Sequence, residues 1–466
     1  MNAGDFTPRQ RFVITFLTLA IVITLPMMAG FIITSAQNWK RLSYILPSPA
    51  LTVDTAPGTA TPLQARTEVS PTPPPTTGPG IWSQVQAARL FDQLAYQVET
   101  IRGLSSRNEV PLSFYPEEDM EALLVRSQNQ EESGVTLQPY VELGILPRVP
   151  TATLRAPHTV AFYAPEQRQI YVSTGMRESN MDDQALLAHA CIHALQDQYF
   201  NLSALDARSI TTDARLATQA LVEGDALFST ALYRYRDPAL AEWERLTVIV
   251  IQSEQPDYGE ELNTVEAWMR LRHFPYWEGR RFVHALFQHG GWEAVNDAYI
   301  NLPHSTAEII HPELYLEGKE LAHVIVPDIS SALPTGWKVI AQDTLGELTA
   351  GLYLETALPP EMAWKAAAGW SGDKFVVWAN PGGARVLIWR SLWETTDEAA
   401  EFEAALSALI PQLYLPARPL VIPKGPVGQW WETETGAISL VRSGRYVTLV
   451  RAPDMNLLAD IVKSLP

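Results

Sequence analysis

The chain has 466 residues, of which 47% are hydrophobic, and it carries a formal net charge of -18 at pH 7. This length and apolar content are enough to bury the cores of two or three folded units, which excludes a largely disordered protein. The acidic balance, without any cluster of Lys and Arg, excludes nucleic acid as a partner, and the single cysteine, Cys191, excludes a disulfide within the chain.

The N-terminal region predicts a membrane anchor. Residues 12–33 form an uncharged apolar run, which at about 1.5 Å per residue is long enough to cross the core of a bilayer. We therefore expect a cytoplasmic N-terminus at 1–11, a transmembrane signal anchor at 12–33, and a single-pass protein of the cell membrane. A cleaved signal peptide is the alternative, although the apolar run is longer than the usual core of such a peptide.

The following segment, 34–80, is rich in proline and threonine and poor in large apolar residues. Such a composition favours extended backbone and cannot build a core. Segments of this kind commonly hold a folded domain away from a membrane. We expect a stalk here, with the globular part of the chain on the extracytoplasmic side.

From residue 81 onward the sequence predicts an α+β fold in two parts. The first part, 81–325, is expected to contain a β-hairpin at 159–173, where two aromatic and β-branched runs flank a polar turn with a proline. The hairpin leads directly into a helix that contains two histidines. Apolar residues at helical spacing predict the other helices of this part at 82–104, 116–130, 211–235 and 279–289.

The second part, 326–466, predicts a small α+β domain, because strand-like runs alternate with helical ones. The strands are expected at 375–378, 385–389, 438–441 and 446–450, and the helices at 360–368, 397–413 and 455–464.

The histidine helix contains the most informative pattern, His189 and His193 at a spacing of four. Residues four apart lie on one face of a helix, and this is how the HExxH motif of zinc metallopeptidases holds its metal. In that motif a glutamate directly after the first histidine deprotonates the zinc-bound water. Ala190 occupies that position here, so the pattern predicts metal ligands without the catalytic base.

A catalytic zinc site needs three protein ligands and one open coordination position. The candidate for the third ligand is Glu223, which lies in the largely apolar helical segment 217–229. Burying an unpaired carboxylate is costly, so Glu223 requires a positive partner. A metal ion would supply it, and an ion pair with Arg215 or Arg234 is the alternative.

Taken together, two histidines separated by three residues and a glutamate on a following helix resemble the gluzincin branch of zinc metallopeptidases. Closer still is the resemblance to bacterial membrane-anchored HExxH proteins, in which a Phe-Tyr-x-Pro hairpin, a histidine helix with Ala-Leu-Gln-Asp, and a Glu-Gly-Asp-Ala segment follow one another. The resemblance implies zinc bound by His189, His193 and Glu223. It also implies that Asp197 orients the ring of His193 from one helical turn away, and that His311 lines the cleft.

The expected function is that of a degenerate peptidase, which binds zinc and holds peptide or protein segments without cleaving them. Ala190 removes the proton acceptor but does not alter the shape of the groove. One alternative is an active protease in which Glu266, Glu308 or His311 replaces the missing base. The other is a metal-free structural module at the cell surface, in which both histidines are ordinary core residues.

Overall fold

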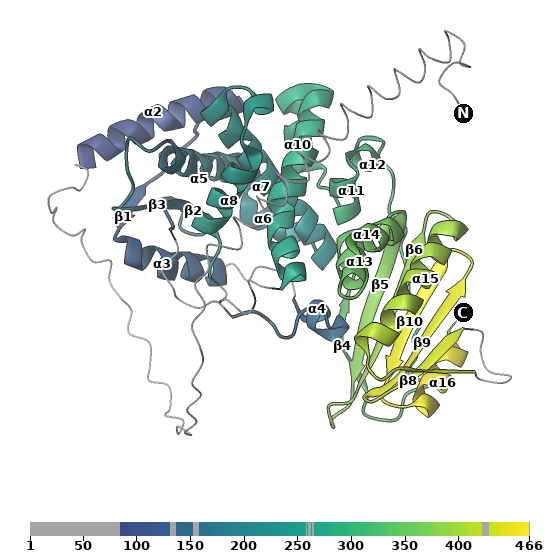
Figure 1. Ribbon diagram of the computed structural model, residues 1–466. Coiled ribbons are helices and arrows are strands. Elements are labelled where there is room, and N and C mark those ends of the chain that lie inside the picture. Colours follow the sequence, from purple (N-terminus) through teal and green to yellow (C-terminus); the bar gives the residue numbers. More distant parts are fainter. Residues whose placement is uncertain are drawn as a thin grey trace, which may run out of the picture. The chain divides into compact units, whose positions relative to one another are not determined.

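The computed structural model describes residues 84–130, 137–151, 158–257, 259, 262, 265–421 and 428–465. All of them belong to one compact unit, residues 73–466. Within this unit the chain forms a mostly helical part with a small three-stranded sheet and, after it, a part built on a seven-stranded sheet (Figure 1). The described chain is therefore mixed α+β.

The prediction of a transmembrane helix is wrong, and so is the prediction of a single-pass location in the cell membrane. No helix in the part of the chain that the structure describes is long and apolar enough to cross a bilayer. The segments that prompted the expectation, 1–11, 12–33 and the stalk at 34–80, lie outside the described residues.

The first part contains the predicted hairpin. Strands β2 (Ala161–Ala164) and β3 (Gln169–Ser173) pair antiparallel, which confirms it, and β1 (Leu112–Tyr115) pairs parallel with β3. The described helices around this sheet, in chain order, are α2 (Gln84–Arg102), α3 (Glu117–Gln130), α4 (Gln138–Leu143), α5 (Met181–Phe200), α6 (Leu202–Arg208), α7 (Thr212–Tyr235), the 3-10 helix η1 (Pro238–Leu240), α8 (Trp243–Glu254), α10 (Glu266–Ile300), α11 (Thr306–Ile310) and α12 (Pro312–Leu316).

Helices α7 and α10 approach each other closely at two glycines. A Cβ atom added to Gly224 of α7 would lie 2.2 Å from the carbonyl carbon of Gly279 of α10. A Cβ atom added to Gly279 would lie 2.1 Å from the carbonyl oxygen of Ala220. Backbones can come this close only where neither residue carries a side chain. This crossing positions the turn of α7 that carries Glu223.

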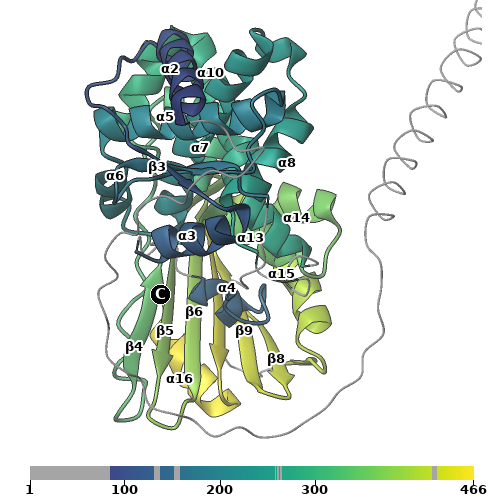
Figure 2. The same cartoon turned by 90° about the vertical axis from the view of Figure 1, so that its left-hand side faces the viewer.

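The second part is a seven-stranded antiparallel sheet with the spatial order β4-β5-β6-β10-β9-β8-β7 (Figures 1 and 2). Its strands are β4 (Lys338–Asp343), β5 (Trp370–Ala379), β6 (Arg385–Trp393), β7 (Arg418–Leu420), β8 (Gln429–Thr433), β9 (Gly436–Ser443) and β10 (Tyr446–Ala452). Its described helices are α13 (Gly346–Glu355), α14 (Pro360–Ala367), α15 (Thr396–Leu413) and α16 (Met455–Ser464).

Alternate residues along the strands of this sheet pack into different hydrophobic clusters. Phe375 and Trp389 belong to a cluster with Phe402 of α15, whereas Val376 belongs to a cluster with Ile461 of α16. Because side chains alternate along a strand, α15 and α16 cover opposite faces of the sheet. The α15 cluster also includes residues of α7 and α10, so the two parts of the unit share one core.

Hydrogen bonds also join the two parts. Asp343, at the end of β4, accepts from the backbone N–H of Thr212 at the start of α7, over 2.9 Å. The backbone N–H of Asp213, the next residue of α7, also donates across this junction, to the carbonyl oxygen of Thr344 over 3.3 Å. Within the first part, the carboxylate of Asp213 accepts from the backbone N–H of Thr306 at the start of α11 over 2.9 Å. Both carboxylates are buried, and both occupy the N-terminal end of a helix, where the unpaired N–H groups favour negative charge.

Candidate metal centre

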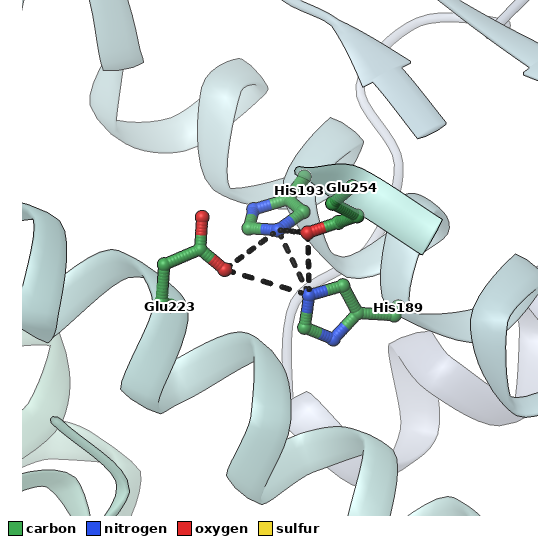
Figure 3. Close-up of side chains that lie close together, drawn as sticks. All are labelled: His189, His193, Glu223 and Glu254. Carbon is green, nitrogen blue, oxygen red and sulfur yellow. Dashed lines mark hydrogen bonds and ion pairs between the residues drawn. The ribbon is translucent and has the colours of Figure 1, made fainter. Parts of the chain in front are cut away.

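The structure brings together the two histidines of α5 and the glutamate of α7 (Figure 3). The Nε2 atoms of His189 and His193 lie 3.1 Å apart. Oε2 of Glu223 lies 3.5 Å from each of them. Both histidines are buried, and Glu223 reaches them across the packed interface between the two helices.

A fourth residue completes the group. Glu254 is the last residue of α8, and its Oε2 lies 3.3 Å from Nε2 of His189 and 3.8 Å from Nε2 of His193 (Figure 3). One ligand atom from each of the four residues lies within 4.8 Å of all the others. Sequence reasoning missed Glu254. We use the term His/Glu cluster for His189, His193, Glu223 and Glu254.

The spacing of the four atoms fits a tetrahedral cation with nitrogen and oxygen ligands. Ligand atoms about 2.0 Å from a tetrahedral zinc ion lie about 3.3 Å from one another. The distance between the two imidazole nitrogens and the four distances from these nitrogens to the carboxylate oxygens range from 3.1 to 3.8 Å, and all four atoms lie within 4.8 Å of one another. Within the described residues, this is the one group of His, Cys, Asp and Glu side chains that converges in this way.

Hydrogen bonding fixes the tautomer of His193. Its Nδ1 lies 2.8 Å from Oε1 of Gln196, and Nε2 of the same amide donates to the carbonyl oxygen of Val222 over 3.0 Å. A carbonyl oxygen can only accept, so the amide nitrogen must face Val222 and the amide oxygen must face the imidazole. Nδ1 of His193 therefore carries a proton and donates it to Gln196. The lone pair of a neutral ring is then left on Nε2.

The same reasoning applies to His189. The hydroxyl of Thr230 donates its proton to the carbonyl oxygen of Ala226 over 2.7 Å, so it accepts from Nδ1 of His189, which lies 3.1 Å away. Nε2 of His189 is therefore also the free nitrogen of the neutral ring. Partners of this kind commonly orient the histidine ligands of metal sites.

Two nitrogen lone pairs and two carboxylate oxygens thus point at one another. Such an arrangement is repulsive unless a positive charge lies among them. Oε2 of Glu223 is buried, and its contacts with Nε2 of His189 and of His193, at 3.5 Å each, are longer than an ordinary N–H···O hydrogen bond, although a buried polar oxygen normally requires a close partner. A metal ion would satisfy this oxygen and the two imidazoles together.

The pKa shifts of the His/Glu cluster also indicate that positive charge is favoured among these residues. Burial alone lowers the pKa of His193, but the carboxylates of Glu223 and Glu254 outweigh burial and raise it well above the ordinary value. The pKa of His189 is also raised, with Glu254 as the main opponent of burial. Burial raises the pKa of Glu223, but His193 and His189 outweigh burial and lower it. Without a metal, the two glutamates therefore favour the protonated form of the imidazoles.

A buried network holds Gln196 in place. Its amide nitrogen also donates to Asp225 over 3.1 Å, and Asp225 in turn accepts from Nε of Arg102 and from the hydroxyl of Tyr299, each over 2.8 Å. Arg102 and Asp225 are fully buried, and Arg102 is part of α2. The orientation of His193 is thus secured by residues of four helices.

Asp197 takes a different place from the one that the resemblance implies. Its Oδ2 accepts from the hydroxyl of Tyr163 over 2.8 Å, and its Oδ1 accepts from the backbone N–H of Leu202 over 2.9 Å. Asp197 therefore ties α5 to the hairpin and to the start of α6. Gln196, the preceding residue, makes the hydrogen bond to His193 instead.

The three residues considered as substitutes for the base make contacts of their own. His311 pairs with Glu347 over 2.9 Å, and Glu308 caps the start of α11. Glu266 is exposed and pairs with Arg270 over 3.3 Å. None of these three substitutes lines the cavity beside the cluster, so His311 does not take the expected place in the cleft.

That cavity has a volume of about 900 Å³ and opens directly onto the cluster. Its lining includes His193, Glu223 and Glu254. Ala190 is fully buried in the apolar core around α5 and is not part of the lining. The position of the missing base therefore contributes no polar atom to the cavity. Cys191 is buried beside it, and burial raises the pKa of its thiol to about 12.

One region of the chain matches a known protein family. Residues 336–462 match a family described as a domain of unknown function (DUF8575), and this region contains the whole seven-stranded sheet. The match includes no residue of the His/Glu cluster. No curated protein and no solved structure matches the chain.

Proposed function

We propose that this chain is a metallopeptidase-like protein that binds zinc through His189, His193 and Glu223 and holds polypeptide segments in the adjacent cavity without hydrolysing them. The observation that carries the proposal is the convergence of two imidazole nitrogens, each fixed as a lone-pair donor by its Nδ1 partner, with a buried carboxylate oxygen that lacks a close hydrogen-bond partner. This is the chemistry of a metal ligand set.

The absence of hydrolysis follows from Ala190. A general base at that position of the HExxH motif accepts a proton from zinc-bound water, and such a base typically contributes about 10²- to 10⁴-fold in rate. Alanine has no proton acceptor, and its side chain lies in the apolar core rather than in the cavity.

The polypeptide ligand is supported by the size and lining of the cavity. Its volume, about 900 Å³, is near the upper end of the range of about 300 to 1,000 Å³ for sites that enclose small ligands. The lining combines aromatic surface from Phe162, Trp268 and Tyr276 with the polar side chain of Gln255. A mixed lining of this kind suits the alternating apolar and polar groups of a peptide.

Elemental analysis of the purified full-length chain tests the metal. We expect about one zinc per chain in the wild type and loss of that zinc in His193→Ala. The matched control is His284→Ala, which removes an imidazole that stacks on Phe228 outside the cluster and should leave the zinc content unchanged. Absence of zinc from the wild type after growth with zinc would refute the proposal and favour a metal-free module.

One observation favours a second candidate function, an active protease. Glu254 supplies a carboxylate that lines the cavity beside the cluster, and it could act as a base in place of the missing glutamate. Hydrolysis of a generic protein substrate by the wild type, stopped by EDTA and abolished in Glu254→Gln, would establish this function. We expect no hydrolysis by either protein.

A further inference from the structure

We infer that Glu254 is a fourth protein ligand, which closes the coordination shell and makes the metal structural. This inference rests on the proposed function. Catalytic zinc sites keep three protein ligands and leave one position for water or substrate, whereas structural sites fill all four positions with protein atoms. Whether Glu254 is a ligand or a base therefore decides what the site can do.

The distances place Glu254 in the position of a ligand. Its Oε2 lies 3.3 and 3.8 Å from the two imidazole nitrogens, and Oε2 of Glu223 lies 3.5 Å from each. The two glutamates thus stand in nearly the same relation to the histidines. A base that acts on metal-bound water must lie farther out, because the water molecule occupies the space between the base and the metal. Glu254 leaves no such space.

The end of α8 is held in this position. The hydroxyl oxygen of Ser253, the preceding residue, accepts from the backbone N–H of Val160 over 3.1 Å. Nε2 of Gln255, the following residue, donates to the hydroxyl of Tyr276 over 3.1 Å. Glu254 therefore lies between two residues that are fixed to the hairpin segment and to α10. A ligand positioned in this way loses little side-chain and backbone entropy when a metal binds.

The location at the end of a helix also favours a cationic partner. The C-terminal end of a helix carries partial negative charge, which disfavours a carboxylate, and Glu254 is 8% exposed. A buried carboxylate at this end requires compensation by positive charge. A divalent ion shared with Glu223 and the histidines would provide it, and it would connect α5, α7 and α8.

Cobalt substitution of the full-length chain tests the inference without relying on activity. The visible absorption of Co²⁺ reports its coordination number, and azide is a small anion that binds to cobalt where a position is open. We expect the wild type to give a four-coordinate spectrum that azide does not change. In Glu254→Gln we expect cobalt and zinc affinity to fall by more than the ~10- to 100-fold that loss of an outer-shell partner causes, and azide to alter the spectrum.

The control is Glu166→Gln, which makes the same chemical change at an exposed residue of the same cavity and should behave as the wild type. An azide-dependent change in the wild-type spectrum, or unchanged metal affinity in Glu254→Gln, would overturn the inference while the proposed zinc site stands. A wild type that retains neither cobalt nor zinc would overturn both. Because the effect of azide on the cobalt spectrum is measured on the wild type, this result does not depend on how well Glu254→Gln folds.

Discussion

Nδ1 of His193 donates a hydrogen bond of 2.8 Å to the side-chain oxygen of Gln196, one helical turn further along α5. The amide cannot turn over, because its nitrogen donates to the carbonyl oxygen of Val222. One helix therefore supplies both a candidate metal ligand and the residue that determines which nitrogen of that ligand is free. This relationship allows the most specific test of the proposed metal site.

Replacement of Gln196 by methionine should weaken zinc binding by about 10- to 100-fold, because His193 loses the acceptor that fixes its tautomer. The measurement is competition for zinc with a chromophoric chelator. Gln184→Met changes another glutamine of α5, whose amide donates to the backbone of Glu178, and should leave zinc affinity unchanged. Equal effects of the two substitutions would mean that Gln196 acts only through helix stability.

Replacement of Thr230 by valine should also weaken zinc binding. Valine keeps the shape of threonine but removes the oxygen that accepts from Nδ1 of His189. The expected loss in affinity is again about 10- to 100-fold. Thr218→Val is the matched control, since Thr218 is a buried threonine of the same helix whose hydroxyl bonds to Ser209. Both variants should lose some stability, but only Thr230→Val should lose metal affinity.

Much of the fold could be predicted from hydrophobic periodicity. The β2–β3 hairpin, α3, α15 and α16 lie within two residues of their expected ends, because each buries one regular face. The edge strands β4 and β7 were missed, since most of their residues are exposed and show no alternation of buried and exposed positions. A strand with one unpaired edge and little buried surface leaves no apolar pattern in the sequence.

The candidate site could be predicted in part. Spacing alone placed His189 and His193 on one face of a helix, but no fixed spacing connects them to Glu254, which is contributed by the separate helix α8. A signal was available, because Glu254 lies three residues after the largely apolar run 246–251, at a helix terminus that disfavours acidic residues. Gln196 could not be distinguished from Asp197, because both lie about one turn from His193.

A pair of glycine substitutions should separate backbone strain from crowding at the junction between the two parts. Gly346 has a φ of +82°, and a Cβ atom there would lie 1.7 Å from Oδ1 of Asp213. Gly383 has a φ of +83° but meets nothing within 4 Å. Gly383→Ala should lower the free energy of unfolding by about 1–2 kcal/mol, the cost of left-handed backbone. Gly346→Ala should lower it by at least about 2 kcal/mol more, because it displaces a buried, hydrogen-bonded carboxylate. Equal losses in urea denaturation would contradict the crowded junction.

Asp373 should make stability depend on pH. Burial raises its pKa to about 6, although the carboxylate accepts from the backbone N–H groups of Leu345 and Gly346. The pKa in the unfolded chain is lower, about 3.9, so the folded state binds the proton more tightly. The stability that this proton contributes is present below about pH 4 and is lost as the pH rises through 6.

We compare the free energy of unfolding of the wild type with that of Asp373→Asn. Between pH 4 and pH 7, the difference between these two free energies should change by at most about 3 kcal/mol. Urea denaturation at several pH values measures this difference. A pH-independent difference for Asp373→Asn would show that its carboxyl group is not perturbed in the folded protein.

The most direct test of the central claim is X-ray absorption at the zinc edge of the zinc-loaded full-length chain. The account predicts a first shell of four nitrogen and oxygen ligands at about 2.0 Å, with the outer-shell scattering of two imidazole rings. A shell of five or six ligands would contradict the closed site formed with Glu254. Zinc without imidazole scattering, or no retained zinc, would contradict the metal centre itself.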